Sequence, residues 1–278
     1  MITLKNISKN FGGLQAVRNV SIEIKKGTIT GLIGPNGAGK TTLFNIIAGF
    51  YKADSGSIAL DNEDISGLRS DELFEKGLLR TFQIAHEFEN LTVRENLMMV
   101  PSHQTGENIV NTWLFAKKIK YEEKINYERA SEVMDFLGLD HLQNEKAGIL
   151  SGGQKKLLEL GRTMMVDAKI VLLDEVGAGV NKTLLKKISK SIARLNTERG
   201  YTFFMIEHDI DFISELCDPI IVMTEGSVLT SGSAEKIKNN DQALKKILFS
   251  FRFKRLSSNY KCLHKISSTS VARNQPKY

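Results

Sequence analysis

The sequence lacks the features that would place the protein across or beyond a membrane, or in an oxidising compartment. The chain is 41% hydrophobic, yet no apolar run approaches the roughly 20 residues of a membrane-spanning helix. The N-terminus, MITLKNISKNFGG, lacks the charged and then apolar pattern of a signal peptide. The two cysteines, Cys217 and Cys262, have neither metal-site spacing nor a disulfide framework. These absences predict a protein of the reducing cytoplasm.

Acidic residues are missing from the C-terminal tail, and this explains the charge of the whole chain. The formal net charge is +6, from 38 Lys and Arg and 32 Asp and Glu. Residues 252–278 contain seven Lys and Arg and no acidic residue, which leaves 31 basic and 32 acidic residues elsewhere, a net charge of −1. We therefore expect no nucleic-acid partner for the body of the protein. The Ser- and Asn-rich composition predicts a basic, disordered tail over 251–278, with contact to anionic lipid or RNA as the alternative.

Apolar runs that alternate with helical stretches predict an α/β fold. The sequence contains no internal repeat. Helices are expected at 40–50 and between the later strands, and residues from about 84 to 160 are helical in period. Continuous apolar runs are typical of a parallel sheet that is covered on both faces. The expected strands are 28–34, 57–60 (followed by a turn at 61–64), 169–174, 202–207, 219–224 and 227–232.

The stretch GPNGAGKTT has the G-x-x-x-x-G-K-[ST] spacing of a phosphate-binding loop. Glycines let backbone N–H groups approach phosphate oxygens, and the helix that follows directs its positive end at them. Lys40 would bridge the terminal phosphates, and the Thr41 hydroxyl would ligate Mg²⁺. The alternative is a glycine-rich turn with a solvated lysine. The predicted nucleotide-binding residues are Gly34, Pro35, Asn36, Gly37, Ala38, Gly39, Lys40, Thr41 and Thr42.

Two adjacent carboxylates, Asp174 and Glu175, end the apolar run 169–174. In a phosphate-loop protein, a carboxylate that ends a neighbouring buried strand is placed to hold Mg²⁺, and Asp174 has that position. Glu175 follows in the turn and could polarise an attacking water as general base. Without the phosphate loop, a solvated pair of charges would be the simpler interpretation.

The stretch LSGGQKK, residues 150–156, predicts a second phosphate site. Ser151 can cap the helix that follows, and Gly152 and Gly153 leave the backbone exposed at its positive end. A helix start with a convenient cap is the alternative. Together with the phosphate loop, this stretch resembles the ATP-binding cassette (ABC) ATPases, and the resemblance covers about residues 2–245.

The resemblance implies roles that spacing alone does not give. Phe11 matches the aromatic residue that stacks on adenine. Gln83, in RTFQ, matches the glutamine that contacts Mg²⁺ and the attacking water, and His208 matches the histidine that contacts the γ-phosphate. The implied catalytic set is then Glu175, His208 and Gln83, and the implied metal set is Thr41, Gln83 and Asp174. Because two cassettes of the family sandwich two ATP molecules, the residues that face the partner's ATP would be Ser151, Gly152, Gly153 and Gln154.

Departures from the common pattern narrow the family. Val176 stands where most cassettes have proline, and Asn181 where most have Asp. Asn181 is typical of the branched-chain amino-acid importer subfamily, which FGGLQAV, RTFQ, LTVRENL, LSGGQKKLLELGR and a long helical stretch at 107–128 also resemble. Urea-importer ATPases are similar but often have another residue at the position of Gly152.

The resemblance implies an ABC ATP-binding domain over residues 2–250. Its fold would be an α/β phosphate-loop NTPase core with a mostly parallel sheet, an N-terminal antiparallel β subdomain and a helical subdomain inserted at about 84–160. Its cofactors would be ATP and Mg²⁺. Expected partners are a second ABC ATPase, identical or paralogous, separate transmembrane permease subunits and a periplasmic solute-binding protein.

The implied function is ATP hydrolysis that powers import of branched-chain or other hydrophobic amino acids, at the cytoplasmic face of the inner membrane. Three alternatives stay open. The solute could be urea, a lipid or a polysaccharide. The chain could be a non-transport cassette that acts on ribosomes or DNA, or a regulatory cassette that binds ATP without turnover.

Overall fold

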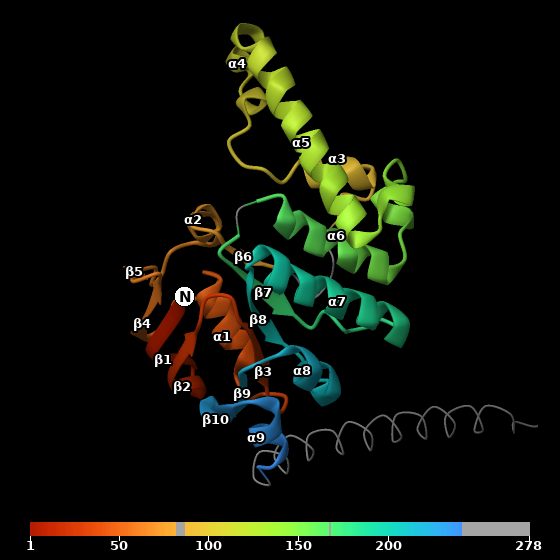
Figure 1. Ribbon diagram of the computed structural model, residues 1–278. Coiled ribbons are helices and arrows are strands. Elements are labelled where there is room, and N and C mark those ends of the chain that lie inside the picture. Colours follow the sequence, from red (N-terminus) through yellow and green to blue (C-terminus); the bar gives the residue numbers. More distant parts are fainter. Residues whose placement is uncertain (82–86, 167, 241–278) are drawn as a thin grey trace, which may run out of the picture.

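Five of the six strands expected from the sequence lie in one six-stranded sheet, together with a short strand at Leu78–Arg80 that was not expected (Figure 1). The computed structural model describes residues 1–81, 87–166 and 168–240. The sheet is parallel except for its last strand, which pairs antiparallel with its neighbour. The predicted parallel sheet is therefore confirmed. Its strand order is β10 (Ser227–Gly232), β9 (Ile220–Thr224), β3 (Ile29–Ile33), β8 (Thr202–Ile206), β7 (Ile170–Asp174) and β6 (Leu78–Arg80).

A second, four-stranded sheet contains the N-terminal strands, and all its pairs are antiparallel. Its order is β2 (Leu14–Ile24), β1 (Ile2–Phe11), β4 (Ser55–Leu60) and β5 (Glu63–Asp64). The predicted antiparallel β portion is confirmed. The predicted turn at 61–64 is wrong in its second half, because Glu63 and Asp64 pair with Leu60 and Ala59.

Helices cover both faces of the parallel sheet because its strands are apolar on both faces. On one face, α1 (Lys40–Ile47) packs between the two sheets, where Phe44 contacts Phe204 of β8 with ring centroids 4.8 Å apart. On the other face, α7 (Lys182–Arg199) and α8 (Ile210–Leu216) pack against the neighbouring strand residue Phe203. Two shorter helices, α2 (Ser70–Glu75) and α9 (Ala234–Lys238), lie at the periphery (Figure 1).

The helices α3 to α6 lie between β6 and β7 in the sequence. They are α3 (Val93–Met98), α4 (Ile109–Leu114), α5 (Ala116–Leu137) and α6 (Gly152–Met164), with 3₁₀ turns at Thr105–Glu107, Asp140–Leu142 and Ala147–Ile149. The long helical stretch predicted at 107–128 is present as two helices, because the backbone at Phe115 leaves the helical conformation (φ −124°, ψ 33°) and separates α4 from α5.

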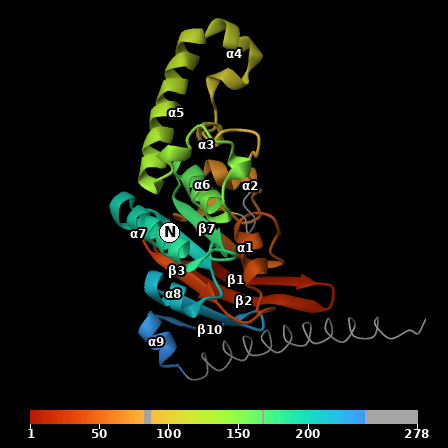
Figure 2. The ribbon, with the colours of Figure 1, turned by 90° about the vertical axis from the view of Figure 1, so that its right-hand side faces the viewer.

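Residues 105–129, which we call the arm, extend away from both sheets (Figures 1 and 2). Only the far end of α5 packs into the core, where Ala130, Val133, Met134 and Leu137 are buried. In the part of the chain that the structure describes, no helix is both long and apolar enough to cross a membrane. The predictions for Gln83 and for the tail at 251–278 lie outside the described residues.

Candidate functional site

The predicted phosphate loop connects β3 to α1, and two of its glycines are required by close backbone contacts. A Cβ on Gly34 would lie 2.1 Å from the Met223 carbonyl oxygen, at the end of β9. At Gly39, which precedes α1 with φ +92°, a Cβ would lie 2.3 Å from the carbonyl oxygen of Ala16. Because any other residue would clash with these carbonyls, the glycines allow the loop to pack between the two sheets.

The Lys40 side chain is buried and folds back over the loop. Its ammonium group donates hydrogen bonds to the carbonyl oxygens of Gly34, at 2.7 Å, and Pro35, at 3.0 Å. A cation at this place faces the same side as the N–H groups at the start of α1. The loop therefore presents the positive charge that a phosphate ligand needs.

A cavity of about 540 Å³ brings the loop together with two residues from distant parts of the chain. Glu175 and His208, which follow β7 and β8, both line it. Gly34, Pro35, Asp174 and Phe11 are absent from its lining. The lining residues are Leu14, Gln15, Ala16, Arg18, Asn36, Gly37, Ala38, Gly39, Lys40, Thr41, Thr42, Glu175, His208 and Glu225.

Glu175 and His208 are in direct contact. The His208 Nε2 atom lies 2.6 Å from the Glu175 Oε1 atom. Glu175 has a left-handed backbone (φ +49°), and its N–H donates to the Ile206 carbonyl of β8. The chain thus turns immediately after β7, and the carboxylate of Glu175 faces the cavity while that of Asp174 stays within the sheet.

Asp174 is buried, with 4% of its surface exposed, and is paired with a residue that the sequence prediction missed. The Arg80 guanidinium donates to the Asp174 carboxylate at 2.7 Å and also to the Asn45 side chain, and it lies over the ring of Phe50. A buried carboxylate is costly without such a partner. The sequence could have indicated this pair, because Arg80, the first residue of RTFQ, ends a buried strand and an arginine there needs an anion nearby.

Glu207 is a second residue that the prediction missed. It directly follows β8, and burial raises the pKa of its carboxyl to about 7. The backbone N–H groups of Gly177 and His208 donate to this carboxylate at 2.8 and 3.3 Å. These hydrogen bonds lower its pKa and so partly offset the effect of burial. Glu207 therefore links the turn after Glu175 to the segment that follows β8 and contains His208.

The predicted capping of α6 by Ser151 is present. The Ser151 hydroxyl accepts from the Gln154 N–H at 3.5 Å, and the Gln154 side chain accepts from the Ser151 N–H at 2.8 Å. A Cβ on Gly153 would lie 1.6 Å from the Leu184 side chain of α7, whereas Gly152 faces open space. None of these residues belongs to the lining of the phosphate-loop cavity.

Two further sequence positions have a structural account. Phe11, at the end of β1, is 43% exposed and packs edge-on against Tyr51, with ring centroids 5.4 Å apart. Asn181 is the N-cap of α7, and its side-chain oxygen accepts from the Leu184 N–H at 2.9 Å. Helix capping therefore explains an asparagine at this position, because asparagine is among the best N-cap residues.

Comparisons with known proteins agree with this geometry. A sequence model of the ABC transporter family matches residues 17–178. A probable branched-chain amino acid transport ATP-binding protein, LivG, of Archaeoglobus fulgidus is 41% identical over 244 residues, 88% of this chain and 93% of the relative. The high-affinity branched-chain amino acid transport ATP-binding protein BraF of Pseudomonas aeruginosa is 34% identical over 248 residues, 89% of this chain and 97% of the relative.

Solved structures give the same result. A nucleotide-free ATP-binding cassette from an ABC transporter superposes with a TM-score of 0.76 at 38% identity, and the alignment covers 89% of this chain and 98% of the other. A dimeric cassette in a post-hydrolysis state with ADP and phosphate superposes with a TM-score of 0.69 at 27% identity, covering 84% and 99%. The chain therefore belongs to the ABC transporter family, as one of its ATP-binding and ATP-hydrolysing cassettes.

Proposed function

We propose that the protein is the ATPase subunit of an importer for branched-chain or other hydrophobic amino acids. The observation that carries this proposal is the single cavity that joins the phosphate loop to Glu175 and His208. The relatives from A. fulgidus and P. aeruginosa are both named for branched-chain amino acid transport, and they match over almost their whole length. Their names favour amino acids over urea as the transported solute.

The cavity has the groups that ATP hydrolysis requires. The loop's N–H groups, the start of α1 and Lys40 would bind the phosphates. The Glu175 carboxylate also lines the cavity and would accept a proton from the attacking water. His208 contacts Glu175 in the structure. From the same position it would contact the γ-phosphate and fix its position relative to the Glu175 carboxylate.

Oxygen donors for Mg²⁺ are present beside the loop. Magnesium prefers carboxylate and hydroxyl oxygens and phosphates, and Asp174 and Thr41 supply the first two. Bound there, Mg²⁺ would neutralise charge on the phosphates. Arg80 donates to one oxygen of Asp174 at 2.7 Å, which orients this carboxylate.

A second cassette would complete the site. Ser151, Gly152, Gly153 and Gln154 lie outside the cavity that contains the phosphate loop. The N-terminus of α6 still has the exposed backbone of Gly152 and an ordered cap. The dimeric cassette among the similar structures supports an arrangement in which this end of α6 faces the partner's ATP. The partner would be an identical or a paralogous chain.

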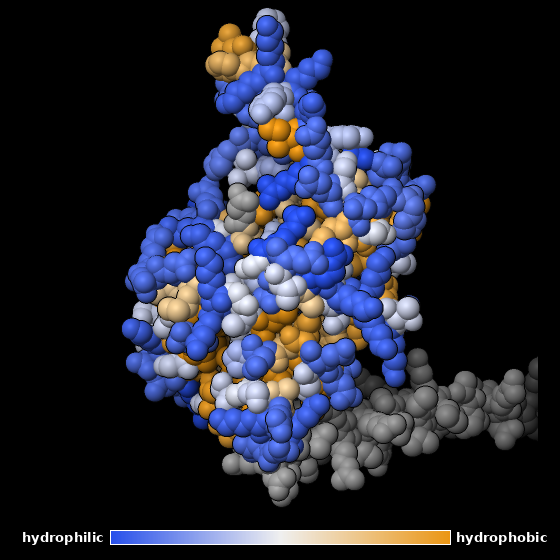
Figure 3. All heavy atoms as spheres, in the orientation of Figure 1, coloured by the Kyte–Doolittle hydropathy of each residue, from blue (hydrophilic) through white to orange (hydrophobic). Residues whose placement is uncertain are grey.

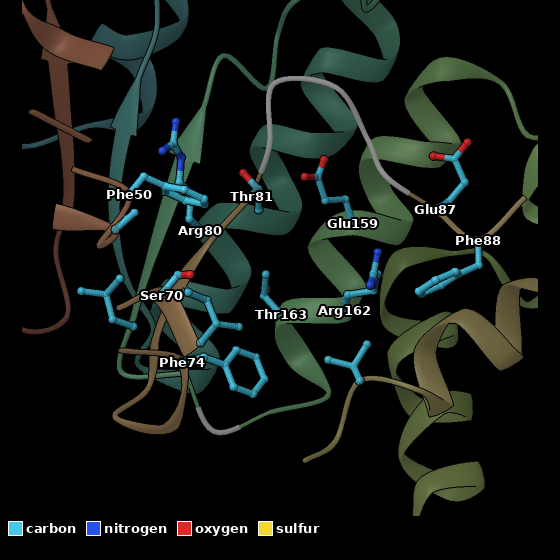
Figure 4. Close-up of a pocket in the computed structure, with 14 residues that line it drawn as sticks. Phe50, Ser70, Phe74, Arg80, Thr81, Glu87, Phe88, Glu159, Arg162 and Thr163 are labelled. Carbon is cyan, nitrogen blue, oxygen red and sulfur yellow. The ribbon is translucent and has the colours of Figure 1, made fainter. Parts of the chain in front are cut away.

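Separate permease subunits would dock at a second cavity, of about 580 Å³ (Figure 4). It lies between α2, β6 and α6, and its lining includes the rings of Phe50, Phe74 and Phe88. The guanidinium of Arg162, on α6, lies 5.5 Å from the centre of the Phe88 ring (Figure 4). A groove with aromatic walls and a few charges suits an amphipathic segment of a partner protein. The protein would then sit peripherally at the cytoplasmic face of the inner membrane, with a periplasmic solute-binding protein on the other side.

Lys40→Ala tests the nucleotide site. Because the variant removes the charge that faces the terminal phosphates, ATP affinity measured by calorimetry should fall by about tenfold or more. Lys5→Ala, at an exposed position on β1, is the control and should bind ATP normally. Unchanged affinity in Lys40→Ala would contradict the assignment of the loop. In vesicles that also contain the permease subunits, ATP-dependent uptake of urea without uptake of leucine would contradict the proposed solute.

A further inference from the structure

The tip of the arm exposes an unusual set of large apolar side chains. Trp113 is 90% exposed and Ile109 83% exposed, and the others are Val110, Leu114 and Phe115. Figure 3 shows an orange cluster at the end of the arm, apart from the rest of the molecule. Soluble proteins rarely leave such a patch uncovered, and a contiguous one marks a contact with another molecule or with lipid.

The arm tip, residues 108–121, is amphipathic. At 100° per residue, Ile109, Val110, Trp113 and Leu114 share one side of α4, and the polar Asn111 and Thr112 occupy the other. Lys117, Lys118 and Lys120 follow at the start of α5, and the Lys118 ammonium pairs with the Glu122 carboxylate at 3.7 Å. Residues 108–121 contain no Asp or Glu, although Glu107 and Glu122 flank them. Apolar side chains that include Trp, followed closely by several lysines, are characteristic of helices that lie in the surface of an anionic membrane.

The tip is held in place and far from the core. The backbone N–H and hydroxyl of Thr105, just before α4, donate to the Glu122 carboxylate of α5 at 2.9 and 2.7 Å. The first buried residue of α5 is Ala130, so the helix extends about 20 Å beyond the core at 1.5 Å per residue. The structure therefore presents the apolar side of α4 at the end of a fixed support.

The base of the arm lies at the proposed permease groove. Val100 lines that groove, and the chain enters the arm at Thr105, a few residues later. In both ribbon views the arm projects beyond α2, which lines that groove (Figures 1 and 2). A chain whose groove faces a permease would therefore direct the tip of its arm towards the bilayer.

We propose that the arm tip inserts into the cytoplasmic surface of the membrane, with its apolar side chains among the lipids and its three lysines at anionic headgroups. Only the direction in which the arm points rests on the proposed docking of a permease. The contact would anchor the cassette to the bilayer independently of nucleotide.

Trp113 is the only tryptophan in the chain and so reports on the tip alone. The full chain, without ATP or permease, is mixed with vesicles of phosphatidylcholine and phosphatidylglycerol in equal parts. We expect Trp113 emission to shift to shorter wavelength and to be quenched by brominated lipid, with a smaller effect for phosphatidylcholine alone. Ile109→Ser/Leu114→Ser should weaken vesicle binding about tenfold or more. Asn111→Ser, on the other side of α4, should bind as the wild type does.

Three outcomes would overturn the proposal. Vesicle binding without a change in Trp113 emission would mean that the basic tail, and not the arm tip, contacts the lipid. An emission shift that needs added permease subunits would assign the tip to a protein partner, and a concentration-dependent shift without vesicles would assign it to a second copy. ATP affinity, measured in parallel, should be equal in all variants, so failure here is distinguishable from failure of the proposed function.

Discussion

Asp174 and Glu175 are adjacent in sequence but have different surroundings. Asp174 ends β7, is buried and is paired with Arg80, whereas Glu175 adopts a left-handed backbone and turns into the phosphate-loop cavity. A carboxylate that must stay charged inside a protein needs a cation, and one that activates water needs access to the ligand. Because the backbone turns at Glu175, these two adjacent carboxylates have the different surroundings that their proposed roles need.

Glu175→Gln is expected to stop hydrolysis and preserve binding. The amide keeps the shape of the side chain but cannot accept a proton, so turnover should fall by about 10²-fold or more. Lys40 and Thr41 are unchanged, and the loss of a negative charge near the γ-phosphate favours ATP. With MgATP the variant should therefore accumulate as a dimer in size-exclusion chromatography.

Glu225→Gln is the matched control, because Glu225 lines the same cavity and the change removes the same charge. It should hydrolyse ATP at nearly the wild-type rate. Near-normal turnover in Glu175→Gln would show that another group activates the water. An inactive Glu175→Gln that stays monomeric at saturating ATP would contradict the sandwich and the role proposed for Ser151.

The raised pKa of Glu207 predicts a pH-dependent stability. The carboxyl titrates at about 7 in the folded protein and at 4.5 when unperturbed, so the folded state binds the proton more tightly. Its contribution is therefore complete below pH 4.5 and is lost as the pH rises through 7, by up to about 3 kcal/mol. Glu207→Gln should lose less unfolding free energy than the wild type over this range, as measured by urea denaturation. Parallel curves for the two proteins would contradict the assignment.

At the level of secondary-structure elements, the contact between α6 and α7 depends on a glycine. Gly153 is buried against the Leu184 side chain, and a Cβ there would lie within 2.4 Å of two of its carbon atoms. The N-terminus of α6, which is the proposed surface for the partner's ATP, is thus fixed to the helix that follows Asp174 and Glu175. Movement of one helix would be transmitted to the other.

Gly153→Ala should destabilise the protein by about 1 to 3 kcal/mol, because Leu184 has to move to admit the new methyl group. Gly152→Ala is the control, since its added carbon meets open space. Denaturant unfolding of the three proteins measures the difference. Equal stability of both variants would mean that α7 shifts at no cost and that the helix contact is loose.

The sequence predicted elements well where burial determined the pattern. The strands β3, β7, β8 and β9 are buried along their whole length, so each appears in the sequence as a continuous apolar run and was predicted as a strand. The short edge strand β6 has three residues and gave no such run. The break at Phe115 was missed because the arm has no core contacts to impose a periodic pattern.

The site was predictable as far as motifs extend. Lys40, Glu175 and His208 were expected to lie together, and the structure brings them to one cavity. Arg80 and Glu207 were not expected, because their importance depends on which charged or buried groups face them in space. Burial and pairing are three-dimensional quantities that spacing along the chain does not give.

At the scale of the whole molecule, the excess of positive charge lies in residues 252–278. The residues before 252 carry a net charge of −1, and the family resemblance ends near residue 245. We expect a protein truncated after Ser250 to stay soluble and to hydrolyse ATP at the normal rate. Steady-state ATPase assays of both lengths check this, and a chain that fails to fold or turn over would show that residues 251–278 belong to the catalytic unit.

The strand order has a consequence for synthesis of the protein. The phosphate loop follows β3, but the strands that flank β3, β8 and β9, come near the end of the described chain. Gly34 also packs against Met223. At roughly 5 to 20 residues per second, a ribosome needs about 10 to 40 s to add the chain between them. Until then the phosphate loop lacks the neighbouring strands β8 and β9. ATP can therefore stabilise the nascent protein only after most of the chain has been made.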